Sequence, residues 1–502
     1  MLAQLAAGGL QWKGITHLDT DELFSQQGMG SAFPALLAMC RDATHVNVVG
    51  SSADTLRALA AHGGAVTHLS ASFGRVSKEE WDKMPCGAEG APGEVMGGWL
   101  AQLKNLRSLQ LVVQDKAVTE AVTRALPSLG ALTRLQWGCN DEGDDEDVVH
   151  LQPGLPQLPD DGRCPPLQEL LVSDAFTAAI TQLNRAAPLN SLTRLESSFI
   201  SSSLDIVQLR HLAAAAPNLR VLKVSELNAG DDDEDDDDEQ APPSPPGGYP
   251  RLAELRELEV IMISGPTGIL RHIMPRLEVL RHEPISKFNV RPLLDHPTLS
   301  KVHYHPLALD DEANYAPFSY LLETLSALKE LSLDYPQGTR PREVRGGDRG
   351  LLLRWLASLR LERLELRLAI EPGALLGVVA ASDSARTVRR VALALAVMPD
   401  EEDEPERALA CLPALERLEE LQLTFKEPRQ GEVEAWEGVL RRMLAPLAEV
   451  RPKALRRVDV RLPSRLLHGA GGGAAHADVV PWEACLELMG SLPGVLTISF
   501  TG

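Results

Sequence analysis

Aromatic residues are scarce in this chain. Phe, Trp and Tyr make up only 4% of the 502 residues, although hydrophobic residues together reach 44%. An interior made from this composition must be filled mainly by Leu, Val and Ala. Because the chain is too long for one compact core, it must form either several globular domains or one extended array of repeats. The aliphatic interior favours an array of stacked units.

Cysteines are few, and long apolar runs are absent. The cysteines form no CxxC pair and no cluster, so neither a disulfide framework nor a zinc module is expected. No run of about 18 apolar residues could span a bilayer. The first residues, MLAQLAAGGLQWKG, lack the basic start of a secretory signal. We therefore expect a protein of the cytoplasm, or of the nucleus, with reduced thiols and no membrane partner. The six cysteines are Cys40, Cys86, Cys139, Cys164, Cys411 and Cys485.

Sequence motifs for catalysis are also missing. There is no GxSxG elbow and no HExxH zinc motif. Residues 45–59, HVNVVGSSADTLRAL, offer one glycine where a phosphate-binding turn needs several. The basic stretch 441–461 has no aromatic residues for base stacking and is interrupted by acids. We expect no enzyme, no cofactor, no metal and no nucleic-acid partner. The alternative is a hydrolase or transferase whose site lies in an irregular segment such as 141–166.

The net charge of −21 is concentrated in three short runs. Asp141–Asp147 hold six acids, Asp231–Glu239 hold nine, and Asp400–Glu404 hold five, which leaves the rest of the chain close to neutral. Such runs cannot bury enough apolar surface to order themselves. We interpret them as insert loops at 141–166, 229–250 and 399–407. They do not match the DxDxDG calcium pattern, and they are expected to leave the same edge of the fold as one acidic rim.

An apolar triplet recurs along the whole chain. Its members are separated by two residues and then by one, and about 17 such units follow one another at roughly 30-residue spacing. The weaker units include Ile15/Leu18, Val46/Val48, Val66/Leu69, Leu192/Leu195, Leu277/Leu280 and Leu299/Val302/Tyr304. The clear units are Leu106/Leu109/Leu111, Leu132/Leu135/Trp137, Leu167/Leu170/Val172, Leu219/Leu222/Val224, Leu255/Leu258/Val260, Leu328/Leu331/Leu333, Leu361/Leu364/Leu366, Val388/Val391/Leu393, Leu418/Leu421/Leu423, Leu455/Val458/Val460 and Val495/Ile498/Phe500.

This pattern resembles the leucine-rich repeat. Residues 132–140, LTRLQWGCN, and 219–228, LRVLKVSELN, come close to its full signature. The resemblance implies an α/β solenoid over residues 1–502, with a curved parallel sheet on the concave face and helices on the convex face. Amphipathic spacing predicts those helices between the strands. They are expected at 55–62, 117–126, 209–216, 351–359 and 434–450, and prolines often end them (Pro217, Pro275, Pro297, Pro413 and Pro493).

Period-two alternation sends the residues between the apolar positions to the concave face. A surface of this length suits another protein better than a small molecule. We predict that this face binds the partner of a monomeric chain. Its expected residues are His17, His45, His68, Arg134, Arg194, Glu257, Glu259, Lys301, His303, Arg363, Glu365, Arg367, Arg390, Arg457, Asp459 and Arg461.

His17, His45 and His68 each follow a threonine at the same position of successive units. Stacking of the units would bring the three rings close enough to share a metal or to titrate together. Repeat duplication alone would also place the same residue at the same position. The pattern therefore leaves both interpretations open.

We predict a non-enzymatic scaffold or adaptor that binds proteins. The helix-rich, proline-punctuated units, such as LRHLAAAAPNLRVLKV, are similar to those of F-box proteins with leucine-rich repeats. This similarity implies a substrate-recognition subunit of a ubiquitin ligase with its F-box absent or truncated. A structural part of a cytoskeletal or ciliary assembly is the other alternative, because a fold alone does not specify a function.

Overall fold

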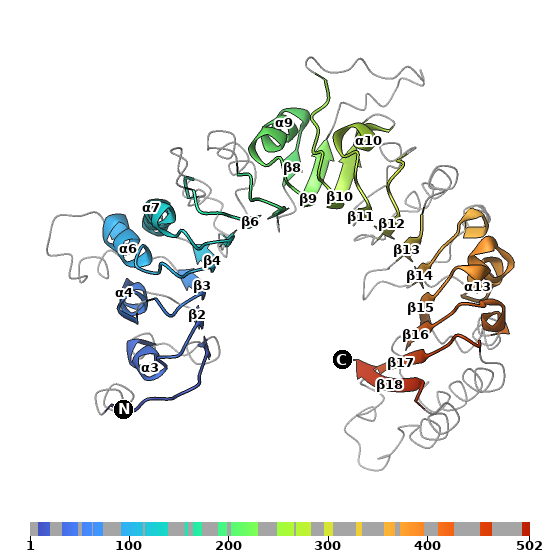
Figure 1. Ribbon diagram of the computed structural model, residues 1–502, viewed down its shortest axis with the longest axis horizontal. Coiled ribbons are helices and arrows are strands. Elements are labelled where there is room, and N and C mark those ends of the chain that lie inside the picture. The colour runs from blue at the N-terminus through green and yellow to red at the C-terminus, as the bar shows by residue number, and fades with distance from the viewer. Residues whose placement is uncertain are drawn as a thin grey trace, which may run out of the picture. The chain divides into compact units, whose positions relative to one another are not determined.

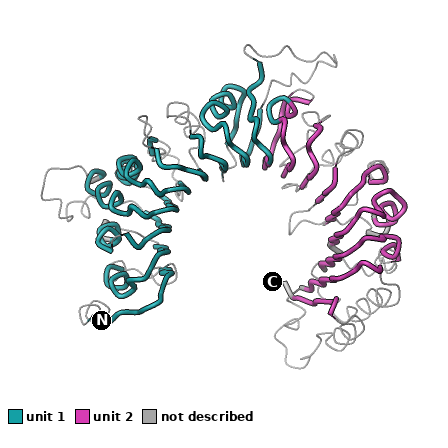
Figure 2. The backbone as a smooth tube through the Cα atoms, viewed as in Figure 1, with its two compact units in different colours: residues 1–231, 242–256, 272–274 teal, residues 232–241, 257–271, 275–502 magenta. Residues whose placement is uncertain are grey.

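The structure is a computed structural model in which the chain forms two compact units (Figure 2). The first unit comprises residues 1–231, 242–256 and 272–274, and the second comprises 232–241, 257–271 and 275–502. The residues that the structure describes are 9–20, 33–48, 53–62, 64–73, 92–113, 116–138, 156–158, 164–172, 189–197, 202–228, 248–265, 268–282, 296–304, 328–333, 356–366, 372–395, 410–425, 452–463 and 494–501.

Parallel strands follow one another in chain order in the first unit (Figure 1). The exception is β8, a two-residue strand that pairs with the end of β9, while β7 pairs with the beginning of β9. The strands are β1 (His17–Asp19), β2 (His45–Val48), β3 (His68–Phe73), β4 (Ser108–Val113), β5 (Arg134–Gly138), β6 (Glu169–Val172), β7 (Arg194–Ser197), β8 (Ser203–Leu204) and β9 (Val221–Asn228).

The second unit also has parallel strands in chain order, each hydrogen-bonded to the next. They are β10 (Glu257–Ser264), β11 (Val279–His282), β12 (Lys301–Tyr304), β13 (Glu330–Leu333), β14 (Arg363–Leu366), β15 (Arg390–Leu395), β16 (Glu420–Phe425), β17 (Arg457–Pro463) and β18 (Leu496–Thr501).

The core of each unit is a row of aliphatic side chains in register. Leu109 on β4 lies beside Leu135 on β5, and the row continues through Leu170, Leu195 and Leu222. All five are buried. Burying one such side chain stabilises the fold by about 1.5–3 kcal/mol. The corresponding row of the second unit is Leu258, Leu280, Val302, Leu331, Leu364, Val391, Leu421 and Val458.

Helices cover one side of the strands in each unit (Figure 1). The first unit has α3 (Phe33–Met39), α4 (Ala53–His62), α6 (Pro92–Leu100), α7 (Lys116–Ala125), the short 3-10 helix η2 (Leu126–Ser128) and α9 (Ile206–Ala215). Helix α10 (Ile269–Ile273) falls at the division between the units. The second unit has α13 (Pro372–Ala381) and the 3-10 helices η6 (Asp383–Arg386) and η7 (Leu412–Ala414).

Local sequence explains how these helices form and pack. Helix α9 begins with a capping box, in which the Asp205 carboxylate accepts from the Gln208 N–H and the Gln208 side chain accepts from the Asp205 N–H. Helices α6 and α7 approach closely because α6 has a glycine at their contact. A Cβ added to Gly97 would lie 3.0 Å from the carbonyl oxygen of Ala121. The absence of a side chain at Gly97 therefore allows α6 and α7 to pack this closely.

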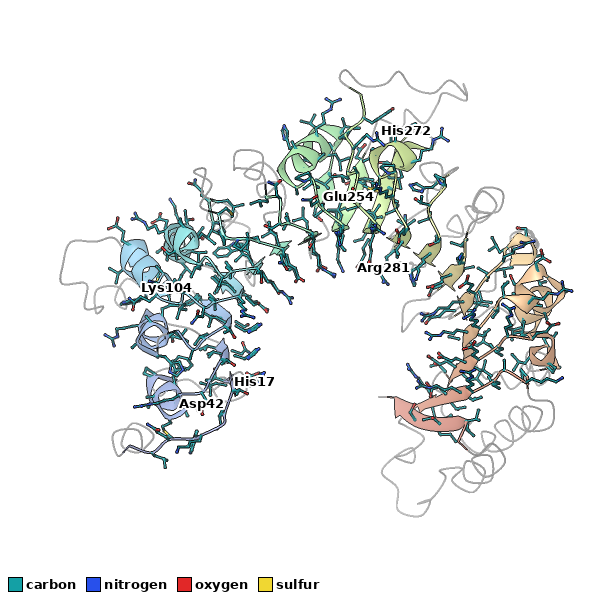
Figure 3. All side chains as sticks on the ribbon, viewed as in Figure 1. His17, Asp42, Lys104, Glu254, His272 and Arg281 are labelled. Carbon is teal, nitrogen blue, oxygen red and sulfur yellow. The ribbon has the colours of Figure 1, made fainter. Side chains whose placement is uncertain are left out.

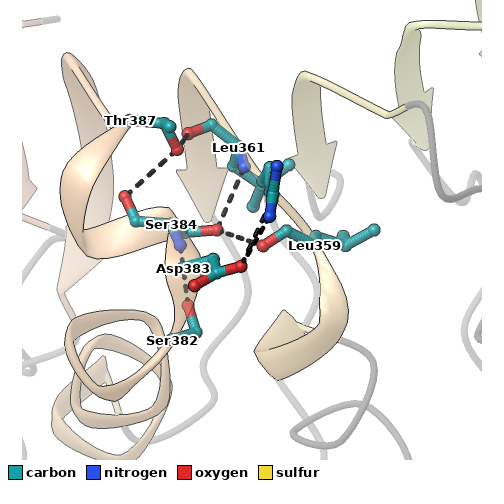
Figure 4. A network of polar contacts seen from close by, with 7 residues as sticks. Leu359, Leu361, Ser382, Asp383, Ser384 and Thr387 are labelled. Atoms are coloured by element: carbon teal, nitrogen blue, oxygen red, sulfur yellow. Dashed lines mark hydrogen bonds and ion pairs between the residues drawn. The ribbon is translucent and has the colours of Figure 1, made fainter.

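In the second unit, the buried hydroxyl of Ser384 links the segment before β15 to the segment before β14 (Figure 4). Ser384 in η6 accepts a hydrogen bond from the Leu361 N–H at 3.0 Å and donates one to the Leu359 carbonyl at 2.7 Å. Thr387 donates to the Leu361 carbonyl at 2.7 Å. These side chains satisfy backbone groups that would otherwise be buried without partners.

The strand positions predicted from the apolar triplets are confirmed, since a described strand lies at every one of them. The helices predicted at 55–62, 117–126 and 209–216 are also confirmed, with shifts of a few residues. The triplets do not predict strand β8, because a two-residue strand carries no periodicity. No helix in the described part of the chain is long and apolar enough to cross a membrane.

Several sequence predictions fall outside the described residues. They include the helix at 434–450, the start of the helix at 351–359 and the insert at 399–407. Most of the inserts at 141–166 and 229–250 also lie outside, so the acidic rim stays a prediction. The continuity of one array over residues 1–502 stays a prediction as well.

Candidate interaction surface

Each unit has a side of its strands on which no described helix lies, and we call the strand residues that point to this side the polar face. Figure 3 shows His17 and Arg281, from the two units, on this side of their strands. In the first unit, the first outward position of each strand carries His17, His45, His68, Ser108, Arg134, Glu169 and Arg194. The second outward position carries Asp19, Asn47, Ser70, Gln110, Gln136, Leu171 and Glu196.

The polar face of the second unit is richer in charge. Its first outward positions include Glu257, Lys301, Glu330, Arg363, Arg390, Glu420 and Arg457. Its second outward positions include Glu259, Arg281, His303, Ser332, Glu365, Gln422 and Asp459, and Arg461 follows on β17. The structure thus places the predicted face residues in two registered rows. Arg367 lies outside the described residues.

Charged residues on neighbouring strands of this face pair with one another. The two partners occupy the same outward position on neighbouring strands or, for Arg281 and Glu257, successive outward positions, so their side chains meet across the parallel strands. Those pairs are Arg281–Glu257 at 2.7 Å, Lys301–Glu330 at 2.9 Å, Arg390–Glu420 at 3.1 Å and, in the first unit, Arg134–Glu169 at 3.5 Å. Each such half-exposed pair contributes about 0–1 kcal/mol.

Other basic residues pair with an acid two positions further along the same strand. Arg457 contacts Asp459 at 2.8 Å, and Arg363 contacts Glu365 at 3.6 Å. Arg194 pairs with Glu196 in the same way in the first unit. Each of these acids is the more buried member of its pair, and the guanidinium covers it. The basic residues in these pairs therefore do not stand as isolated positive charges.

This pairing makes the polar face of the second unit nearly neutral. Its described strands carry six basic residues, of which Arg461 is one, and six acidic ones. A long-range field toward a polyanion is absent from such a face, since opposite charges alternate within a few ångströms. Sequence reasoning identifies the arginines but misses Glu330 and Glu420 as partners on the face. The signal that could have found them is the opposite charge at the same position of adjacent triplets.

His303 lies half-buried within this face. Burial lowers the pKa of its imidazole, and Arg281 and Arg363 lower it further, while Glu365 and Glu330 act in the opposite direction. The ring is therefore neutral at pH 7, and it presents hydrogen-bonding nitrogens among ion pairs.

The three histidines of the first unit form a stack. The His17 and His45 ring centroids are 4.2 Å apart, and those of His45 and His68 are 4.0 Å apart, with interplanar angles of 16° and 9°. Burial lowers the pKa of His68, and the neighbouring His45, Arg107, Arg134 and His17 add to this effect. The prediction that stacking brings these rings together is confirmed. The described residues hold no group of three potential ligands arranged around a metal position.

The cysteines that the structure describes are not activated thiols. Burial raises the pKa of Cys40, Cys164 and Cys411, and that of Cys164 reaches about 11. A nucleophilic cysteine needs a lowered pKa, so that a useful fraction is thiolate at neutral pH. These three side chains are therefore protonated and unreactive at pH 7.

Comparison with models of known protein families gives no match, and comparison with curated proteins gives none either. The registered polar face is therefore the feature on which a functional proposal must stand.

Proposed function

We propose that this chain is a protein-binding scaffold of the leucine-rich-repeat type, without catalytic activity of its own. In this proposal the units form a solenoid, and the partner lies on its concave side against the polar face. The observation that carries it is the registered rows of half-exposed polar side chains on a side of the strands that no described helix covers. Another protein, with its mixture of donors, acceptors and charges, matches such a surface.

The pairing of charges makes this proposal testable without unfolding the chain. Exchanging the members of a cross-strand pair keeps the ion pair but inverts its polarity toward a partner. We would make Arg390→Glu with Glu420→Arg, and Lys301→Glu with Glu330→Lys, in one variant. Because both pairs remain, its thermal unfolding should match that of the natural chain within about 1 kcal/mol.

A matched control lies on the helix side. Arg360, which precedes β14, and Asp383 in η6 form an exposed ion pair at 3.1 Å, and neither residue lies on a strand; Figure 4 shows Asp383 in the 3-10 helix. The exchange Arg360→Asp with Asp383→Arg also inverts an ion pair, but it does so outside the polar face. Affinity capture from cell extract at pH 7.5, read by quantitative mass spectrometry, should recover the same partner with the natural chain and the control.

The polar-face variant should lose that partner at least tenfold. Equal recovery with all three proteins would contradict the proposal that this face binds the partner. The identity of the captured protein also separates a ligase adaptor from a structural assembly.

A further inference from the structure

The threonines before His45 and His68 fix which nitrogen of each ring carries the proton. Thr44 donates its hydroxyl proton to the carbonyl of Thr16 at 3.3 Å, and Thr67 donates to the carbonyl of Thr44 at 3.2 Å. The same hydroxyl oxygens lie 3.0 and 2.9 Å from Nδ1 of His45 and His68. A hydroxyl has a single proton to donate. It must therefore accept from Nδ1–H, which leaves Nε2 of the neutral ring without a proton.

The geometry of the stack argues against a shared metal ion. A metal binds an imidazole nitrogen at about 2 Å and close to the ring plane. Rings that are 4.0–4.2 Å apart and within 16° of parallel direct their Nε2 lone pairs side by side, so the lone pairs do not converge. Convergence would require the rings to tilt away from the threonine contacts that hold Nδ1.

Protonation, by contrast, needs no movement of the rings. A proton added at Nε2 leaves each Nδ1–H contact with threonine intact and turns the ring into a cationic donor. Two neighbouring imidazolium ions 4.0–4.2 Å apart would repel each other. An anion bound across the stack would remove this repulsion and would draw further protons onto it.

The charged groups around the histidine stack differ in whether they are already paired. The Arg107 side chain is exposed beside β4, and no described residue forms an ion pair with it. Arg134 is already paired with Glu169, and Asp19 accepts a hydrogen bond from Asn47 on the same face. Arg41 and Asp42 lie in the turn before β2, where Asp42 accepts from the Gly14 N–H.

We propose that His17, His45 and His68, together with Arg107, form an acid-gated docking strip for an acidic peptide segment of a protein partner. This inference rests on the proposed protein-binding function and specifies one part of the polar face. Three parallel strands span roughly 10 Å, which matches a few acidic side chains. Asp19, Glu169 and Glu196 on the same face confine the positive charge to the row of three histidines and Arg107, which fits a few acidic side chains of a peptide better than the regularly spaced phosphates of a nucleic acid strand.

The experiment uses a fluorescein-labelled peptide with three consecutive aspartates between neutral Gly-Ser flanks, and fluorescence anisotropy on the full chain at constant ionic strength. We expect the peptide to bind at least tenfold tighter at pH 5.5 than at pH 7.5. The variant His17→Gln/His45→Gln/His68→Gln should lose this gain. The matched control His211→Gln/His272→Gln, which changes histidines outside the polar face, should keep it.

Two results would overturn the proposal: equal affinity at both pH values, or a pH gain that persists in the triple variant. An oligothymidylate of eight nucleotides is tested in parallel, and a pH gain for it without one for the peptide would also overturn the proposal. Circular dichroism shows whether the triple variant is folded.

A second measurement does not depend on the variant. In the natural chain with 13Cε1-labelled histidine, adding the peptide at pH 5.5 should shift the resonances of the three stacked histidines. Unmoved signals would contradict the proposal. The exchange of ion pairs in the second unit, which is tested at pH 7.5, decides the proposed function separately.

Discussion

His282 offers the clearest test of how burial controls the stability of the second unit. It lies on β11, on the core side of the sheet, beside Val260 of β10 in register. The side chain is only 1% exposed, and burial lowers its pKa from 6.5 to about 3. The folded unit therefore holds this imidazole in its neutral form throughout the range in which free histidine titrates.

The direction of the pH effect follows from this lowered pKa. Between about pH 3 and pH 6.5 the unfolded chain binds a proton that the folded chain does not bind, so stability rises with pH there. The contribution is complete above 6.5 and is lost as the pH falls below that value. At pH 5.0, which is 1.5 units below the ordinary pKa, the expected loss is about 2 kcal/mol, because one unit corresponds to about 1.36 kcal/mol.

The measurement is urea unfolding followed by circular dichroism at pH 7.5 and 5.0, on the natural chain and on His282→Leu. Leucine is close in size and suits the apolar surroundings without a titrating group. His68 and His303 also have lowered pKa values, so both proteins should lose stability on acidification. The natural chain should lose about 2 kcal/mol more than the variant. An equal loss in both proteins would refute the reasoning, because His282 would then not carry the pH dependence.

Three further changes test the packing. Leu222→Asp places a charge where the natural side chain is fully buried; several kcal/mol of lost stability is expected, and an unchanged melting temperature would contradict the strand assignment. Ser384→Ala leaves the Leu361 N–H without its acceptor, so urea unfolding should show a loss of about 1–3 kcal/mol. Gly97→Ala in α6 should destabilise because its Cβ meets α7 at 3.0 Å, whereas Gly98→Ala, which meets nothing within 4 Å, should stabilise the helix by about 0.5–1 kcal/mol. Equal melting temperatures for the two alanine variants would contradict the α6–α7 packing.

The strands could be predicted from sequence because each one needs apolar residues at fixed spacing. Leu258 and Leu364 stand at the same position of their triplets, and both are buried in the same row. The polar face could be listed for the same reason, since alternation in a strand leaves no freedom once the buried side is known.

Other features depend on contacts between distant residues, and no local pattern encodes them. Alternation places position 282 on the buried side and His303 on the polar face, but it does not show how completely the neighbouring strands enclose the His282 ring. The role of Ser384 depends on the backbone of Leu359 and Leu361, more than 20 residues earlier. The division into two compact units likewise has no signal in the triplets.

The cross-strand ion pairs have a consequence for how this surface can change. Each pair, such as Lys301–Glu330 or Arg390–Glu420, can be inverted without altering the number of charges or the contact between the strands. Two compensating substitutions exchange the positions of the positive and negative charge that face a partner, and the ion pair between the strands is kept. Each pair can be exchanged without changing the others. Laboratory selection can therefore reach new specificities on this chain if both members of a pair change together, because a single change would place like charges opposite each other.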